Sequence, residues 1–182
     1  TLFRSVTDIM RASIPINRLV VNALGDWVTG EDIFIGQGRN IDRILADQLF
    51  DLAALMVDGF FVPALREFDE VWFYAVAGNH GRTGRPGTHH PRTNFDYILY
   101  RTLATNLSKN ERFRSFVSES PFLGYHLPDQ PAWKHLLQHG DTFKSWMGIP
   151  YYGLDRYASR VITMTQVNWN YIHVGHHHTG AA

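Results

Sequence analysis

Four strand-like segments of this chain end in polar residues that can bind a metal ion, and this arrangement constrains the fold more than any other feature. The clearest segment is 70–77, an apolar run rich in aromatic and β-branched residues, which stops at the turn 78–82 with the sequence Gly-Asn-His-Gly-Arg. The run is too short for most helices and predicts a buried strand. Because ligands gather at the carboxyl ends of strands in open α/β sheets, Asn79 and His80 are expected at the edge of a functional site.

The other three segments repeat the pattern of an apolar run followed by a polar turn. They are 19–24 before Gly25 and Asp26, 136–137 before His139, Gly140 and Asp141, and 171–174 before Gly175 and the histidines at 176–178. In an extended segment, side chains alternate between faces, so His176 and His178 should point to one side and His177 to the other. A purification-tag remnant or a solvated loop is the alternative for three consecutive histidines. The pattern predicts one pocket formed by Asp26, Asn79, His139, His176 and His178.

The types of these residues indicate which metals the pocket would take. Cysteine is absent, so any metal must be held by nitrogen and oxygen ligands. Carboxylate, amide and imidazole groups together suit borderline divalent ions such as Mn²⁺, Fe²⁺ or Zn²⁺. In hydrolytic sites with two such ions, the ions lie about 3.5–4 Å apart and activate a water molecule.

The ordered set Gly-Asp, Gly-Asn-His, His-Gly and Gly-His-x-His resembles the calcineurin-like metallophosphoesterase family, and the resemblance extends from Gly25 to His178. It implies a four-layer αββα sandwich that binds two divalent ions, Mn²⁺ first and Fe²⁺ or Zn²⁺ as alternatives, and hydrolyses a phosphoester. By position, it implies that Asp26 bridges the ions, that Asn79, His139 and His176 complete the shell of the second ion, and that His178 serves the first. His80 would then stabilise the phosphoryl transition state or protonate the leaving group.

The chain departs from the family pattern at its first motif. The family's first strand ends in Asp-x-His, whereas here the only Asp before Asp26 is Asp8, in a helix-like stretch, and no His precedes His80. We therefore expect a single domain over 1–182 that is incomplete at its N-terminus, with an apolar strand before Thr1 that pairs beside 19–24 and 70–77. The alternative is an inactive or one-metal member that acts as an interaction or structural protein.

A basic loop follows the Gly-Asn-His turn. Residues 81–93 contain Arg82, Arg85 and Arg92 among glycines and prolines and no acidic residue. We predict that Arg82 and Arg85 bind substrate phosphate, and a solvated lid is the alternative. A phosphodiester substrate, with DNA as the candidate, is favoured over phosphoprotein.

The rest of the sequence predicts one α/β domain. A length of 182 residues and a 45% hydrophobic composition suit one domain, and the balance of 17 basic and 17 acidic residues gives no global field. Helical periodicity predicts a core helix over 40–68, capped by Asn40 and broken near Gly59 and Pro63. Its most apolar stretch, 49–62, is shorter than the roughly 20 residues that a membrane span needs, and we expect a cytoplasmic protein. Further helices are expected over 2–12, 94–107 and 155–164, and short strands over 112–119, 122–127 and 133–138 are expected to form an antiparallel meander. The oligomeric state is left open.

Overall fold

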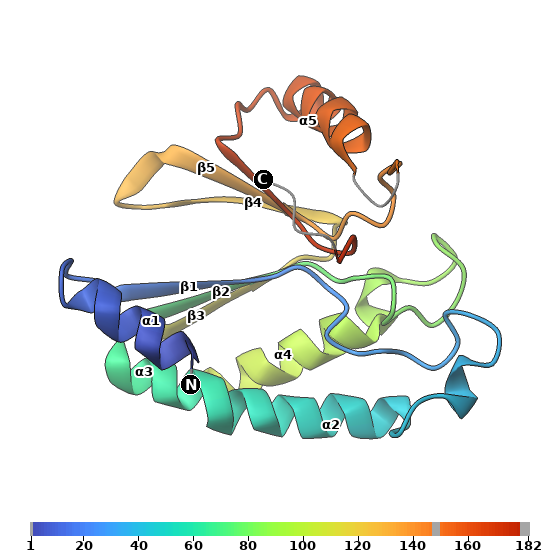
Figure 1. Cartoon of the computed structure of the whole chain (residues 1–182), viewed down its shortest axis with the longest axis horizontal. Coiled ribbons are helices and arrows are strands. Elements are labelled where there is room, and N and C mark those ends of the chain that lie inside the picture. The colour runs from blue at the N-terminus through green and yellow to red at the C-terminus, as the bar shows by residue number, and fades with distance from the viewer. Residues whose placement is uncertain (1, 147–149, 179–182) are drawn as a thin grey trace.

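Two three-stranded sheets face each other and carry helices on their outer sides, as Figure 1 shows. The computed structural model describes residues 2–146 and 150–178. Beneath the first sheet lie α2 (Leu45–Met56), α3 (Val62–Glu67) and α4 (Phe95–Leu107), and α5 (Tyr151–Thr165) lies beyond the second. The other elements outside the sheets are helix α1 (Leu2–Arg11), two short 3₁₀ helices, η1 (Gln37–Arg39) and η3 (Pro91–Thr93), and the π-helical segment η2 (Val57–Phe61). The predicted α/β class is confirmed.

The first sheet is wholly parallel. Its strands are ordered β1 (Arg18–Ala23), β2 (Glu70–Ala75) and β3 (Phe113–Val117). Strand β2 is buried along nearly its whole length, as expected for a central strand with both faces covered. Strand β1 pairs directly with β2 from Arg18 opposite Glu70 to Ala23 opposite Ala75. An additional strand therefore has no place between β1 and β2, and within the described chain the other side of β1 is a free edge.

The second sheet contains β4 (Phe122–Leu127), β5 (Gln130–Gln138) and β6 (Tyr171–Val174). Strands β4 and β5 form an antiparallel hairpin, whereas β5 and β6 are parallel. The predicted meander is thus wrong for its first strand, because β3 belongs to the first sheet. Helix α4 returns the chain to the starting end of β2, and such a crossover produces a parallel neighbour. Alternation of polar and apolar side chains predicts a strand, but it does not determine which strand it pairs with.

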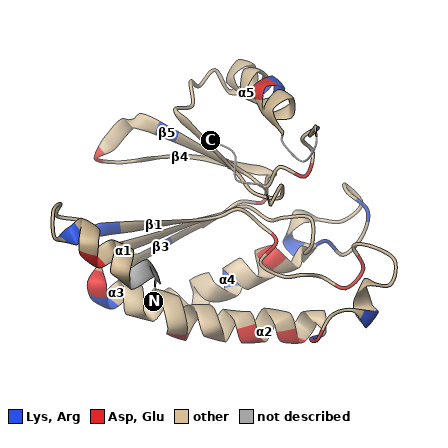
Figure 2. Ribbon diagram, in the orientation of Figure 1, with Lys and Arg blue, Asp and Glu red and all other residues tan. Residues whose placement is uncertain are grey.

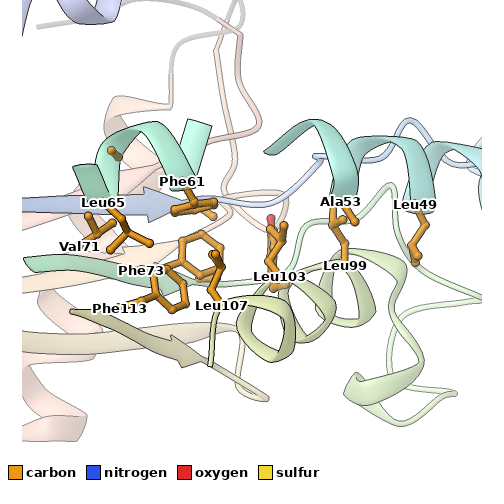
Figure 3. Packing of buried hydrophobic residues seen from close by; sticks show 14 of the residues in the cluster. Leu49, Ala53, Phe61, Leu65, Val71, Phe73, Leu99, Leu103, Leu107 and Phe113 are labelled. Atoms are coloured by element: carbon orange, nitrogen blue, oxygen red, sulfur yellow. The ribbon is translucent and has the colours of Figure 1, made fainter. Parts of the chain in front are cut away.

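The main hydrophobic core lies between the first sheet and helices α2 to α4. Leu49 and Ala53 of α2 face Leu99 of α4, while Phe61 and Phe73 pack edge to face with ring centroids 5.3 Å apart (Figure 3). Burial of aliphatic and aromatic side chains of this size stabilises the fold by about 1.5–3 kcal/mol each. This layer holds β1 and β2 firmly, and with them the loops that follow.

The predicted break in the long helix is instead a π-helical segment, Val57–Phe61, between α2 and α3. The Val62 N–H bonds to the Val57 carbonyl, five residues back, and the helix continues through Pro63. A π turn of this kind absorbs the missing proline N–H without ending the helix. The predicted Asn40 cap is wrong, because α2 begins only at Leu45.

The same helix is the one described segment that is long and apolar enough to span a membrane, by length and composition alone. Its inner side contributes Leu49, Ala53 and Phe61 to the core, and acidic residues mark its outer side (Figure 2). The inner side of the helix therefore packs in the core as predicted, but only 28% of its most apolar 18-residue window is buried.

A second, smaller core joins the two sheets. Trp72, Tyr74 and Val76 from the first sheet meet Leu137 and Tyr125 from the second. The rings of Tyr74 and Tyr125 stack with centroids 3.8 Å apart. This contact fixes the spacing of the sheets, and hence the spacing of the loops at their carboxyl ends.

Candidate metal centre

Three side chains from distant parts of the sequence meet at the carboxyl ends of the strands. Asp26 follows β1, His139 follows β5 and His176 follows β6, and one ligand atom from each lies within 4.8 Å of the others. These strand ends lie on the same side of the two sheets (Figure 1). The convergence follows from the parallel pairing of β1 with β2 and of β5 with β6, and no ion is needed to explain it.

Asn79 joins this group through His139. The Nε2 atom of His139 lies 3.0 Å from Asp26 Oδ2 and 2.9 Å from Asn79 Oδ1. Its other ring nitrogen, Nδ1, lies 2.6 Å from the Leu24 carbonyl, to which an Nδ1–H can donate. A histidine held in this way by a backbone carbonyl presents Nε2 as a metal ligand, and such a partner orients the ring.

Two glycines allow the loops after β1 and β2 to approach each other. A Cβ on Gly78 would lie within 3.0 Å of the Asp26 backbone nitrogen and of its carboxylate. A Cβ on Gly25 would come equally close to the Gly78 backbone, and Gly25 has a φ of +87°. The two glycines before Asp26 and Asn79 are therefore required by close backbone contact, which is a physical reason for the Gly-Asp and Gly-Asn-His patterns.

The sequence analysis missed Asp96, whose carboxylate organises both loops. It is fully buried and accepts backbone N–H groups from Asp26 at 2.8 Å, Trp27 at 3.0 Å, Val28 at 3.3 Å and Gly78 at 2.9 Å. Asp26 has a φ of +57°, a left-handed conformation that such bonds help to maintain. Burial raises the pKa of Asp96 although these N–H groups act in the opposite direction.

Asp96 is held at the N-terminus of α4 by the cap residue Asn94. The Asn94 side chain accepts the Asp96 N–H at 2.8 Å and donates to the Gly78 carbonyl at 2.9 Å. The sequence signal for this arrangement was an Asn followed two residues later by an Asp at a predicted helix start. That pattern indicates a cap, and it gave no sign that the carboxylate would reach two other loops.

His80 lies beside the three-residue group and is oriented by its own contacts. Its backbone N–H donates to Asp26 Oδ1 at 2.9 Å, and its Nδ1 lies 2.7 Å from the Thr29 carbonyl. The opposite ring nitrogen, Nε2, is 3.8 Å from Asp26 Oδ2. The side chain is 27% exposed, so a molecule bound beside Asp26 can reach it.

The charges of the group are mutually dependent. Burial opposes ionisation of Asp26, but its bonds to His139 and the His80 N–H lower its pKa below the usual value. Burial likewise acts to lower the pKa of His139, and the Asp26 hydrogen bond outweighs it, so that the pKa is raised. Burial and the neighbouring His139 lower the pKa of His176. A divalent cation held by Asp26 Oδ2 and His139 Nε2 would displace any proton between these two atoms, because metal ligands must be deprotonated.

His178 is not brought into the group. It is exposed, whereas His176 is partly buried against the His139 ring with centroids 5.0 Å apart. The predicted alternation requires extended backbone, but His176 and His178 have φ angles of +68° and +50°. Because of this turn the two side chains do not alternate as predicted, and His178 does not join Asp26, His139 and His176.

The two predicted substrate arginines line a hollow of about 780 Å³ that reaches Asn79. Arg82 donates to the Asp141 carboxylate across the hollow's edge, so part of its charge is already compensated. Arg85 lies on the exposed loop that forms one wall. The geometry keeps both residues near the site and gives Arg82 an ion-pair partner that the sequence did not indicate.

The donor set of one carboxylate, one amide oxygen and two imidazoles fits a borderline divalent ion such as Mn²⁺, Fe²⁺ or Zn²⁺. No known family model, curated protein or solved structure matches the chain. Any assignment of function therefore depends on the geometry of these residues.

Proposed function

We propose that the chain is a metal-dependent phosphoester hydrolase of the calcineurin-like metallophosphoesterase type, with the αββα layers of that family. The observation that carries the proposal is the meeting of Asp26, His139 and His176 within 4.8 Å, next to Asn79. These residues lie in the Gly-Asp, Gly-Asn-His, His-Gly and Gly-His-x-His patterns, in that order. Two facing sheets with helices outside agree with the proposed architecture.

The side chains around the group have distinct roles in this proposal. A bound divalent ion would polarise a phosphoryl oxygen and lower the pKa of a bound water. His80 is held by Thr29 with Nε2 toward the site, so it donates a proton to the leaving oxygen or stabilises the charge on phosphorus-bound oxygen. Arg85, on the wall of the hollow that reaches Asn79, supplies positive charge to a second part of the substrate.

The number of ions is the point on which two forms of the proposal differ. The expected pair, with Mn²⁺ favoured, requires His178 and a bridging Asp26. The exposure of His178 instead favours a one-ion site, because the described group of Asp26, His139 and His176 with Asn79 supplies one shell. A one-ion member that binds phosphoesters without rapid hydrolysis is therefore the second candidate function.

Metal content and phosphodiesterase activity, measured on the same samples, test the proposal. We expect wild-type protein to bind Mn²⁺ in calorimetry and to hydrolyse a chromogenic diester, bis(4-nitrophenyl) phosphate, only with metal. His139→Ala should abolish both properties, because it removes the ligand that contacts Asp26 and Asn79. His126→Ala, an exposed histidine on β4, is the matched control and should change neither. A wild-type protein that binds no divalent ion would refute the hydrolase, and a stoichiometry of one with slow turnover would select the second candidate.

A further inference from the structure

A basic hollow lies at the start of α5, outside the group of predicted ligands. It has a volume of about 370 Å³ and is formed by the loop after β5 and the first three turns of α5. Its charged side chains are Lys144, Arg156 and Arg160, and no acidic residue lines it. Tyr152, Arg156 and Arg160 are four residues apart and so share one face of the helix. The hollow is a concentrated positive site on a chain whose overall charge is balanced.

Lys144, Arg156 and Arg160 form none of the ion pairs found among the described residues. Within the described chain, the arginines that form ion pairs are Arg18, Arg43, Arg82, Arg92 and Arg114. The acidic residue of α5, Asp155, is not part of the lining. Like charges four residues apart weaken a helix, so Arg156 and Arg160 are placed at a cost that an anionic ligand would offset.

Exposed aromatic rings accompany the charges. The Arg156 guanidinium lies over the Tyr152 ring, 5.6 Å from its centroid. The side chains of Tyr151, Tyr152 and Trp146 are 58%, 65% and 82% exposed. Cationic grooves combined with exposed aromatic rings are typical of single-stranded nucleic-acid sites, in which phosphates meet Lys or Arg and unpaired bases stack on the rings.

The hollow is connected to the candidate metal centre by side-chain contacts. Phe143 lines the hollow, and its ring stacks on His177 with centroids 6.4 Å apart. His177 in turn contacts the His176 ring, with centroids 5.2 Å apart. A strand of nucleic acid bound at Arg156 and Arg160 therefore lies next to the centre.

We propose that Lys144, Arg156 and Arg160 with Tyr152 form a binding site for single-stranded nucleic acid that leads to the candidate metal centre. The inference rests on the proposed function for the reaction, and it names the substrate class of that reaction. Duplex is excluded as the preferred ligand because its bases are already stacked on each other and cannot stack on Tyr152, the exposed ring that lines the hollow.

Binding is measured without metal, so that its outcome is independent of hydrolysis. The probe is a fluorescein-labelled 15-nucleotide oligothymidylate, titrated with the 182-residue chain in EDTA and followed by fluorescence anisotropy between 50 and 200 mM KCl. We expect Arg156→Ala/Arg160→Ala to weaken binding and to lower the slope of log affinity against log salt by about 1.4, at about 0.7 per lost phosphate contact. Arg101→Ala, an exposed cation on α4 in the opposite outer layer, is the matched control and should retain the wild-type affinity.

Tyr152→Leu separates base stacking from charge. It should weaken oligothymidylate binding about fivefold or more with little change in salt slope. Inorganic polyphosphate should compete weakly and should not respond to Tyr152→Leu. Wild-type affinity for the oligonucleotide in the double-arginine variant would overturn the proposed site. The proposal would also be overturned if polyphosphate bound as tightly as the oligonucleotide and Tyr152→Leu kept the wild-type affinity for the oligonucleotide. A wild-type protein that binds the oligonucleotide but does not hydrolyse the chromogenic diester with metal present would instead count against the proposed function alone.

Discussion

Replacing Asp96 by Asn should destabilise the protein far more than an ordinary change of charge. Four backbone N–H groups donate to its carboxylate, and two of these bonds, from Val28 and Gly78, are buried. An Asn side chain has one oxygen with two lone pairs and turns an NH₂ group toward the remaining donors. Two N–H groups would then lack an acceptor, at about 1–3 kcal/mol each. The expected loss of about 2–6 kcal/mol compares with a typical total stability of about 5–15 kcal/mol.

The control for this variant is Asp47→Asn. Asp47 is also in the first turn of a helix, but it is exposed. Its replacement should cost only the helix-dipole contribution of about 0.3–1 kcal/mol. Both variants are unfolded with urea in EDTA and followed by circular dichroism, so that metal binding does not contribute. Equal unfolding free energies for Asp96→Asn and Asp47→Asn would show that the buried carboxylate does not hold the two loops.

Three further predictions follow from the site and the second sheet. His80→Ala should lower kcat by about 10²–10⁴-fold and leave the metal content unchanged, as is typical of a lost general acid. A loss of metal as large as that in His139→Ala would mean that His80 is a ligand. Gly78→Ala should lower both stability and Mn²⁺ affinity in calorimetry, because its Cβ would lie within 3.0 Å of the carboxylate that binds the ion. Gly38→Ala should lower neither, because its Cβ would come no closer than 3.6 Å to the Glu31 carbonyl oxygen. Burial lowers the pKa of both His135 and His173, whose ring nitrogens lie 3.0 Å apart. Because the unfolded chain then binds protons more readily, this contribution to stability should be fully present above the ordinary histidine pKa of about 6.5 and should be lost as the pH decreases from there toward the lower folded pKa values. His173→Gln should flatten this pH dependence in urea titrations, and an unchanged slope would contradict the assignment.

The sequence was sufficient to predict where four of the site residues would meet. Asp26, Asn79, His139 and His176 each follow a strand, and parallel pairing carries the carboxyl ends of strands to one edge. Gly25 and Gly78, which precede Asp26 and Asn79, marked two turns where the backbones approach too closely for a Cβ atom. These are local signals, so a single sequence contains them.

Features that depend on contacts between distant residues were not predictable in this way. The pairing of Arg82 with Asp141 joins residues 59 apart in sequence, and Asp96 binds the backbone of Asp26 and Gly78, which lie 70 and 18 residues before it. His178 was misjudged for another reason, because alternation assumes extended backbone and the chain there is left-handed. The partner of β3 likewise depended on the path of α4 and not on the strand's own pattern.

The predicted ligands are divided between the two sheets, so a bound ion would cross-link them. Asp26 and Asn79 are attached to β1 and β2, while His139 and His176 are attached to β5 and β6. An ion present at a hundred times its dissociation constant would add about 2.7 kcal/mol to the free energy of unfolding. Because that energy stabilises the contact between the sheets, chelation should lower the melting temperature. It should also weaken this contact before other parts of the fold, which faster amide hydrogen exchange in β5 and β6 would detect. Metal supply would thus regulate how tightly the two halves of the molecule stay closed.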